Sequence, residues 1–421
     1  MHDFTYKKNI LHGEGVSVPR IAAEVGTPFY LYSHKTITDH FQKLKDAFAS
    51  VDPLICYSVK ANSNIAVIRS LVNRGAGLDI VSGGELFRAR IAGADPRTIV
   101  YAGVGKTADE IDAALQDDIL LFNAESLNEL ELLDARAKEL GKRPRIALRI
   151  NPNIEAKTHK YITTGKQDKK FGIDFNTARW VFANSNRFLH LKIRGVHIHI
   201  GSQIVESGPF AQAIKKTRDF ISALKNNGAR IEYFNIGGGL GIIYHQERPQ
   251  TADEYARVVL PIIRGCGLKI ILEPGRFIVG NAGILVTRVT YVKRTKTKTF
   301  IIVDAGMNDL VRPTLYEAYH EIVPVVKKTR VAKTSRACDI VGPICESGDF
   351  FALGRRVDVP AQGDLLAVMS AGAYGFSMSS NYNSRLRACE VMVRDKHFSS
   401  IRERETYADL IKGEVMPRII R

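Results

Sequence analysis

Residues 54–64 of this 421-residue chain read LICYSVKANSN, and they begin the pattern that decides its fold. Apolar or aromatic side chains fill five of the six positions from Leu54 to Val59, which predicts a buried strand. The expected strand ends in Lys60, although lysine is rarely buried without a partner. Lys60 either marks the exit of the strand to solvent or supplies an amine that condenses with a carbonyl group. The rest of the chain decides between these interpretations.

Seven further apolar runs follow, separated by segments with helical spacing. Leu127, Leu130 and Leu133, for example, recur three positions apart in residues 126–141. Eight strand–helix units in about 225 residues predict a (β/α)₈ barrel of the TIM type, and a doubly wound sheet is the competing fold. The expected strands are 54–60, 77–82, 98–103, 119–124, 145–151, 193–201, 231–239 and 268–275.

After residue 278 the sequence changes to runs of Val, Ile and Thr separated by turn residues, which predicts a mainly β domain. A further strand, TPFYLYS at 27–33, precedes the barrel. We therefore expect a barrel at residues 35–278. We also expect a β-barrel or β-sandwich domain formed by residues 1–34 and 279–421.

The bulk composition limits the class of protein. No apolar run reaches the length of a membrane span, and the N-terminus lacks the apolar core of a signal peptide. The five cysteines are scattered without a CxxC pair, so the sequence predicts neither a disulfide framework nor a zinc site. A net charge of +16 can indicate nucleic-acid binding, but the basic residues are mostly dispersed and no nucleic-acid motif accompanies them. We expect a cytoplasmic protein without a nucleic-acid or membrane partner.

Polar side chains gather where the expected strands end, which is where barrels of this type carry their active sites. NIGGGLG (235–241) and EPGR (273–276) follow the seventh and eighth strands, a common place for a phosphate site. Glu273 either pairs with Arg276 or keeps a pyridine nitrogen protonated while Arg276 binds a phosphate or carboxylate. His197 and His199 lie two apart, which is at best part of a metal site, and for His197 ordinary packing is the first interpretation.

Three stretches of the β domain also stand out. Arg312 and Tyr316 are four residues apart, Cys345 lies beside Glu346 in a glycine-flanked loop, and Tyr374 lies in a loop rich in glycine and serine. Each has an ordinary explanation as a helix-face pair, an inert thiol or a flexible turn. Because three such stretches occur in one domain, the ordinary explanations are less convincing for the set than for each stretch alone.

Eight motifs in order, from about residue 25 to residue 395, resemble the bacterial diaminopimelate decarboxylases, a family of fold-type III enzymes that use pyridoxal 5'-phosphate (PLP). The motifs are YSVKANSN, GLDIVSGGEL, HIHIGSQI, NIGGGLGI, EPGRFIVGNAG, VDAGMNDLVRPTLYEAYH, GPICESGD and AGAYGFSMSSNYNSR. The resemblance implies a barrel followed by a β domain and the PLP-dependent conversion of meso-diaminopimelate to L-lysine and CO₂. It also implies a homodimer with its active sites at the interface.

The resemblance also implies roles for individual residues. Lys60 would carry PLP as a Schiff base, and Cys345 of the partner subunit would be the proton donor. The cofactor-binding set implied in this way is Lys60, His199, Ser202, Gly238, Gly239, Glu273, Gly275, Arg276 and Tyr374. The substrate-binding set is Arg276, Arg312, Tyr316, Glu346 and Tyr374, and no metal is implied.

The sequence leaves several alternatives open. A decarboxylase acting on ornithine or arginine would have little use for Arg312 and Tyr316, because those substrates lack a distal carboxylate. An amino-acid racemase would need a second base opposite Lys60, and a non-catalytic PLP-binding protein could lose the Cys345 loop. The motif pattern departs from the family at Leu386, where proline is expected, which puts the rigidity of that loop in doubt.

Overall fold

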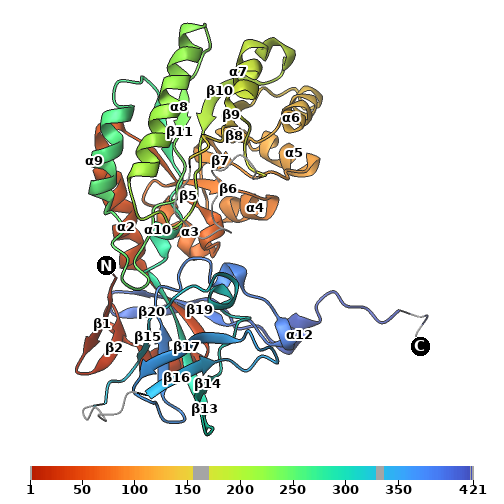
Figure 1. Cartoon of the computed structure of the whole chain (residues 1–421). Coiled ribbons are helices and arrows are strands. Elements are labelled where there is room, and N and C mark those ends of the chain that lie inside the picture. The colour runs from red at the N-terminus through yellow and green to blue at the C-terminus, as the bar shows by residue number, and fades with distance from the viewer. Residues whose placement is uncertain (1, 155–169, 329–335, 418, 420–421) are drawn as a thin grey trace. The chain divides into compact units, whose positions relative to one another are not determined.

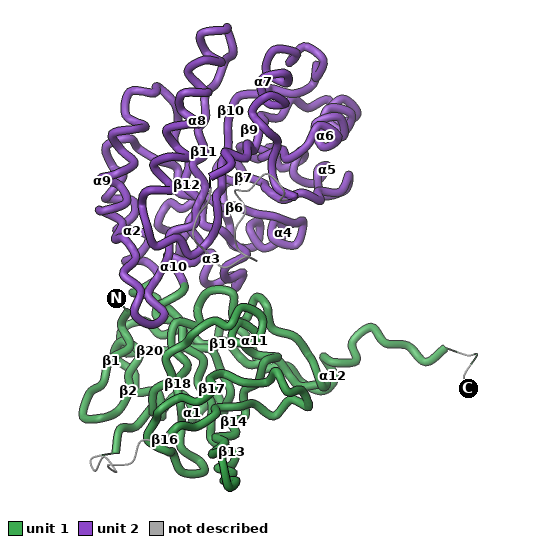
Figure 2. Tube along the Cα trace, viewed as in Figure 1, with its two compact units in different colours: residues 1–36, 280–421 green, residues 37–279 purple. Residues whose placement is uncertain are grey.

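The computed structural model describes residues 2–154, 170–328, 336–417 and 419, and it divides into two compact units (Figures 1 and 2). Ile37–Val279 form one unit, called the barrel unit below. Met1–Thr36 and Gly280–Arg421 form the other, called the β unit.

Eight parallel strands close into a barrel in the barrel unit, so the predicted (β/α)₈ fold is confirmed and the doubly wound sheet is wrong. The chain runs around the barrel in sequence order, and β9 and β10 complete the closure. The strands are β5 (Leu54–Ser58), β6 (Gly77–Ile80), β7 (Ile99–Tyr101), β8 (Leu121–Ala124), β9 (Arg145–Arg149), β10 (Lys192–His197), β11 (Tyr233–Asn235) and β12 (Lys269–Leu272).

Helices alternate with these strands and surround the barrel (Figure 1). Capping side chains set where two of them begin. Thr107 and Glu110 form a capping box at the start of α5, and the Ser126 hydroxyl accepts the backbone N–H of Glu129 at the start of α6. The helices are α2 (His34–Ala47), α3 (Ile65–Val72), α4 (Gly83–Ile91), α5 (Ala108–Gln116), α6 (Leu127–Glu139), α7 (Phe175–Ala183), α8 (Gly208–Asn226), α9 (Ala252–Ile263) and α10 (Arg276–Val279).

Side chains of different strands meet in the interior of the barrel. A fully buried cluster there joins Cys56, Val100, Leu121, Ala147 and Ile271, which come from five strands. A TIM-type barrel is filled by such layers of side chains, so it is a packed core and not a pore. Function is therefore confined to the rim.

The β unit contains a nine-stranded mixed sheet whose main path runs β17-β16-β14-β13-β4-β19-β20. The N-terminal strand β4 lies inside this sheet, antiparallel to β13 and parallel to β19. The strands of the unit are β1 (Phe4–Lys7), β2 (Ile10–Gly13), β3 (Val16–Ser17), β4 (Phe29–Ser33), β13 (Gly283–Arg294), β14 (Thr299–Val303), β15 (Ile322–Pro324), β16 (Arg336–Val341), β17 (Phe350–Val357), β18 (Leu365–Val368), β19 (Cys389–Arg394) and β20 (His397–Arg402). Its helices are α1 (Val18–Val25), α11 (Arg312–Tyr316) and α12 (Tyr407–Leu410).

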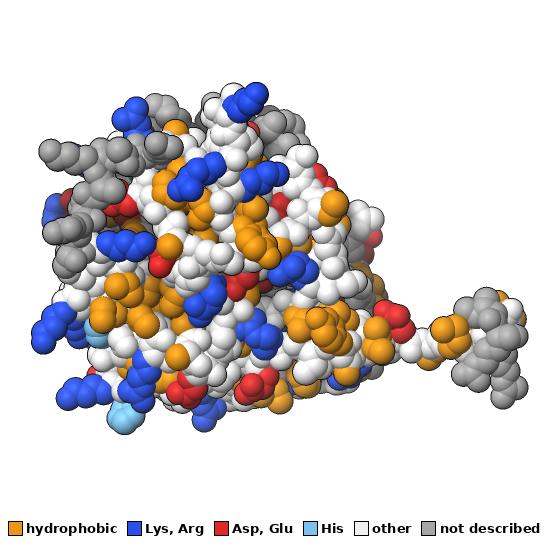
Figure 3. Space-filling model, turned by 90° about the horizontal axis from the view of Figure 1, so that it is seen from below, with side chains coloured by type: hydrophobic (Ala, Val, Ile, Leu, Met, Phe, Trp, Pro, Cys, Tyr) orange, Lys and Arg blue, Asp and Glu red, His pale blue; other side chains and the backbone are white. Residues whose placement is uncertain are grey.

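The chain has a formal net charge of +16. On the face drawn in Figure 3, Lys and Arg side chains are dispersed among neutral and apolar ones. Across the described residues, no helix combines the length and the apolar character that a membrane crossing requires.

Candidate active site

Lys60 lies just beyond β5, in a single 3₁₀ turn formed by Val59–Ala61. Its ammonium nitrogen is 2.5 Å from Oδ2 of Asp79, whose side chain is 0% exposed. The Ser58 hydroxyl donates to the same oxygen at 2.6 Å. A Cβ on Gly275 would lie 3.0 Å from Cβ of Ser58, so the loop after β12 packs directly against the end of this strand. Lys60 is thus held by a buried carboxylate, which a lysine that only marks an exit to solvent would not need.

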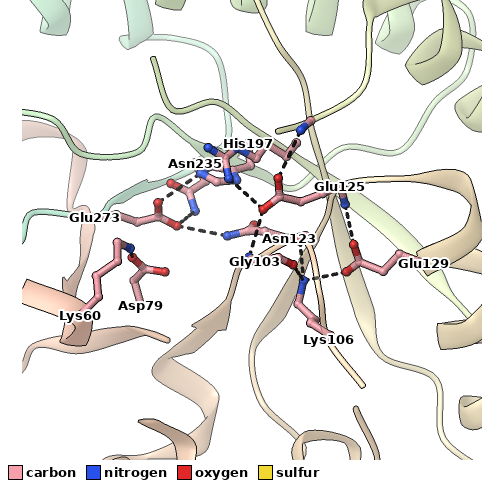
Figure 4. A network of polar contacts seen from close by, with 12 residues as sticks. Lys60, Asp79, Gly103, Lys106, Asn123, Glu125, Glu129, His197, Asn235 and Glu273 are labelled. Carbon is pink, nitrogen blue, oxygen red and sulfur yellow. Dashed lines mark hydrogen bonds and ion pairs between the residues drawn. The ribbon is translucent and has the colours of Figure 1, made fainter. Parts of the chain in front are cut away.

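Glu273 follows β12 directly and is 4% exposed. Its Oε1 accepts the side-chain amide N–H of Asn235 at 2.6 Å and that of Asn123 at 3.1 Å. Its Oε2 lies 3.1 Å from Nε2 of His197. Figure 4 shows these side chains converging on the carboxylate, and they come from β11, β8 and β10. His197 is buried, as an ordinary packed histidine would be, but it also contacts this carboxylate.

The surroundings keep Glu273 ionised. Burial acts to raise the pKa of this carboxyl, but the charge and hydrogen bond of His197, together with Lys60, outweigh burial and hold the pKa well below its usual range. Asp79 has the opposite balance, because burial and the nearby Glu273 raise its pKa despite Lys60. Two neighbouring carboxyl groups therefore have pKa values displaced in opposite directions, a feature that is common at functional sites.

The loops after β10, β11 and β12 bring together groups that suit an anion. Arg276 donates from Nη1 to the Tyr244 hydroxyl at 2.5 Å and from Nη2 to Oγ of Ser202 at 3.1 Å. Gly238 is needed because a Cβ there would lie 2.0 Å from a backbone carbonyl oxygen, and Gly239 has φ = +109°. A guanidinium, two hydroxyls and a backbone free of side chains are the features of a phosphate site.

His199 lies two residues beyond the end of β10, and its Nδ1 accepts the backbone N–H of Gly238 at 3.3 Å. Burial, together with the charges of Arg149 and Lys60, lowers the pKa of His199 to about 3. The imidazole is therefore neutral at physiological pH, and its face suits stacking on an aromatic ring. Within the residues that the structure describes, no group of three or more His, Cys, Asp and Glu side chains is placed to hold a metal ion.

The β unit carries the remaining predicted residues. Arg312 opens α11 and is 5% exposed, with its Nε 3.4 Å from Nε2 of His320. Its guanidinium carbon lies 5.7 Å from the centre of the Tyr316 ring. Tyr374 has φ = +55° in the loop that follows β18. The structure thus brings Arg312 and Tyr316 together.

Cys345 and Glu346 lie exposed in the loop between β16 and β17. Asp349 holds this loop, because its carboxylate accepts two backbone N–H groups at 2.6 Å each, one of them within the loop. The backbone N–H of Cys345 donates to Oδ1 of Asn383 at 2.7 Å. The Tyr382 hydroxyl donates to Oε2 of Glu346 at 3.3 Å. The loop with the predicted proton donor therefore has a defined conformation within its own unit.

Sequence reasoning did not assign Asn235, Tyr244 or Asn383. Asn235 opens the glycine-rich stretch and ends β11, so its position at a strand end was an available signal. Asn383 lies inside the motif AGAYGFSMSSNYNSR, but the sequence does not show the contacts of Asn383 or Tyr244, because their partners lie 38 and 32 positions away.

The barrel site fits PLP, the cofactor that the resemblance implies. Lys60 offers an amine, and Glu273 offers an ionised carboxylate that is already surrounded by donors. Arg276 lies among hydroxyl and backbone groups suited to a phosphate. An amine, a carboxylate and an anion site are the three features that a PLP-binding barrel requires.

Comparisons with known proteins agree with this fit. The family described as "Pyridoxal-dependent decarboxylase, pyridoxal binding domain" matches residues 34–280. The chain is 48% identical over 408 residues to the diaminopimelate decarboxylase of Aquifex aeolicus, with 97% of this chain and 96% of that protein covered.

Two solved structures cover almost the whole chain. The Helicobacter pylori diaminopimelate decarboxylase complexed with L-lysine superposes with a TM-score of 0.90 at 41% identity, covering 94% of this chain and 98% of that one. The structure described as diaminopimelate decarboxylase from "m. jannaschii" in co-complex with L-lysine gives a TM-score of 0.94 at 36% identity, with both chains covered in full (100%).

Proposed function

This chain belongs to the diaminopimelate decarboxylases, and from that premise we propose how its own residues carry out the reaction. The enzyme is a PLP-dependent carboxy-lyase that converts meso-2,6-diaminopimelate to L-lysine and CO₂, a step of lysine biosynthesis. The observation that supports the assignment of roles is the buried Glu273 carboxylate, held from three strands at the rim that also carries Lys60.

Bound PLP supplies an electron sink, which takes up the electron pair left behind when the substrate loses its carboxylate as CO₂. In our proposal Lys60 holds the cofactor covalently and Glu273, kept ionised by His197, holds the ring nitrogen protonated. His199, whose imidazole is neutral because its pKa is lowered, would stack on the ring. Arg276, which donates to Ser202, would form the phosphate region with Gly238, Gly239 and Gly275, and Arg276 would also contact the substrate.

The β unit would complete the site. Cys345 of the partner subunit would donate a proton to the substrate carbon that has lost CO₂, which makes the enzyme a homodimer with its sites at the interface. Arg312, Tyr316 and Glu346 would bind the distal carboxylate and ammonium of diaminopimelate, since their signs are the ones those groups require. Tyr374 would reach both cofactor and substrate. The domain boundaries in this proposal are 35–278 for the PLP-binding barrel and 1–34 with 279–421 for the β domain.

We place the enzyme in the cytoplasm, without a nucleic-acid or membrane partner. The dispersed Lys and Arg side chains on the face drawn in Figure 3 and the lack of a spanning helix among the described residues are compatible with this proposal.

The first test is CO₂ release from meso-diaminopimelate by the purified protein with and without PLP, with ornithine and arginine as parallel substrates. We expect PLP-dependent release from diaminopimelate alone and none from a Lys60→Ala variant. Reduction with borohydride followed by peptide mapping should find the cofactor on Lys60. Release mainly from ornithine or arginine would overturn the roles given to Arg312 and Glu346.

A mixing experiment tests the shared site. Lys60→Ala and Cys345→Ala variants should each be inactive alone. If each site takes Cys345 from the partner, random mixing of the two gives about a quarter of the wild-type activity, because half of the dimers then carry one intact site. No recovery after verified subunit exchange would place Lys60 and Cys345 of each site in the same chain.

A further inference from the structure

A buried ion pair lies behind the site, and none of the roles above uses it. Nζ of Lys106 is 2.7 Å from Oε1 of Glu129, and their side chains are 1% and 8% exposed. Lys106 lies in the loop between β7 and α5, and Glu129 lies in the first turn of α6. Removing two charges from water is costly and is offset only by close geometry and full hydrogen bonding. The pair therefore calls for a physical explanation.

The Lys106 ammonium donates to three acceptors. Besides Glu129, these are the backbone carbonyl of Gly103 at 2.8 Å and that of Asn123 at 3.0 Å. An ammonium has three N–H donors, so all of them are satisfied. The bond to Asn123 links the pair to the active site, because the side chain of the same residue donates to Glu273.

Glu129 ties down the same strand end through its other oxygen. Its Oε2 accepts the backbone N–H of Glu125 at 2.9 Å. The Glu125 carboxylate accepts from Nη1 of Arg149 at 2.8 Å and from the backbone N–H of Gly103 at 3.0 Å. Figure 4 shows this network leading from Lys106 to the Glu273 carboxylate. The ion pair thus fixes the backbone at residues 123 and 125, on both sides of the end of β8.

Asn123 depends on that support. Its side chain is fully buried, and its Oδ1 has no hydrogen-bond partner among the described residues. The amide is therefore aimed only by its bond to Glu273 and by the position of its own backbone.

We propose that Lys106 and Glu129 are positioning residues for catalysis, which hold the end of β8 so that Asn123 keeps Glu273 oriented toward the cofactor ring. This inference rests on the proposed function of Glu273 and extends it to two residues that touch neither cofactor nor substrate.

The test is a double-mutant cycle on the full-length holoenzyme with Lys106→Met, which removes the ammonium and keeps the chain length, and Asn123→Ala. The readouts are kcat, KM and the pH dependence of the visible absorption band of bound PLP. We expect each single variant to lower kcat about tenfold, the effect of one hydrogen bond to a charged group, and to shift the pH at which the band changes. The double variant should match Asn123→Ala, because Lys106 acts through Asn123. The proposal is overturned if the double variant lowers kcat by the product of the two single effects, or if Lys106→Met leaves the absorption band unchanged.

Two further variants separate positioning from stability. Lys106→Met leaves Glu129 as a buried charge, so Lys106→Met/Glu129→Gln provides a neutral pair in which the glutamine carbonyl still accepts the Glu125 N–H. We expect it to fold and keep the altered band, because the bond to the Asn123 carbonyl is still missing. A wild-type band in the neutral pair would show that charge balance alone matters and would refute positioning.

Arg402→Met is the matched control, because it breaks the ion pair of Arg402 with the fully buried Glu390 in the β unit. It should lower the urea midpoint and leave the band unchanged, and an equal shift of the band would count against the proposal. Wild-type protein run in parallel distinguishes two failures. If wild-type protein shows no cofactor band, the proposed function is refuted and this inference with it. If wild type shows a normal band but the effects of Lys106→Met and Asn123→Ala on kcat are independent, this inference alone is refuted.

Discussion

Replacing His197 by Phe tests whether this histidine sets the charge of Glu273. Nε2 of His197 is 3.1 Å from Oε2 of Glu273, and the two side chains are 1% and 4% exposed. Phenylalanine fills a similar volume but offers neither an N–H group nor a positive charge. His197→Gln is the matched control, because glutamine is neutral and still carries an N–H donor.

The expected cost follows from the burial of the pair. Removing one partner of a buried ion pair destabilises a protein by about 3–5 kcal/mol. Loss of His197 also raises the pKa of Glu273, because His197 is the main group that lowers it. In the wild type this pKa lies below its usual range. That carboxyl therefore stabilises the fold fully above its unfolded-state pKa, and the contribution is lost progressively as the pH falls from that value through the lower folded-state value.

Two measurements follow. Urea unfolding of the apo-protein should show the largest difference between wild type and His197→Phe near neutral pH, with the difference shrinking as the pH falls below about 4, where the Glu273 carboxyl of the unfolded chain is protonated. In the holoenzyme of His197→Phe, kcat should fall at acidic pH over a range in which the kcat of the wild type stays constant. The profile of His197→Gln should lie between those of wild type and His197→Phe. Equal urea midpoints and identical kcat profiles for wild type and His197→Phe would refute the reasoning.

Three further predictions concern the rest of the site. Arg276→Lys should raise the dissociation constant of PLP about tenfold or more, measured by equilibrium dialysis, because lysine cannot reproduce the two-sided guanidinium contacts. Cys345→Ser should lower kcat about a hundredfold or more without changing PLP affinity, as expected for loss of a general acid, and an unchanged kcat would remove Cys345 from that role. Asp349→Asn puts an amide N–H against a backbone N–H and so disturbs the loop that carries Cys345. We expect a lower kcat and a changed rate of Cys345 alkylation relative to wild type, with PLP affinity unchanged.

The fold was accessible to sequence reasoning because each barrel strand is a short apolar run bounded by turn residues. The ends of the strands were less accessible. Residues 231–239 were expected as one strand, whereas β11 comprises only Tyr233–Asn235. The glycines that follow leave the ladder, and Gly237 and Gly239 adopt positive φ angles of 70° and 109°. Apolar periodicity does not record where a backbone stops pairing with its neighbours, and here that point begins the loop that we propose binds the phosphate.

The site was accessible only where its residues lie in compact motifs. Lys60, Glu273 and Arg276 belong to recognisable stretches, and Lys106 does not. The acceptors of Lys106 on β8 and α6 lie 17 and 23 positions away, so nothing adjacent in the sequence marks it as buried. Sequence reasoning therefore identifies the groups proposed to touch a ligand more readily than the buried groups packed behind them.

The polar support of Glu273 depends on where three strands end. His197 and Asn235 are the last residues of β10 and β11, and they are register partners in the ladder, so their side chains leave the sheet on the same face. Asn123 reaches the same carboxylate from β8. A shift of one residue in any of these strands would turn its polar side chain to the opposite face. The ladder register therefore decides which polar groups reach Glu273, and in our proposal Lys106 acts on Glu273 through the end of β8 without touching it.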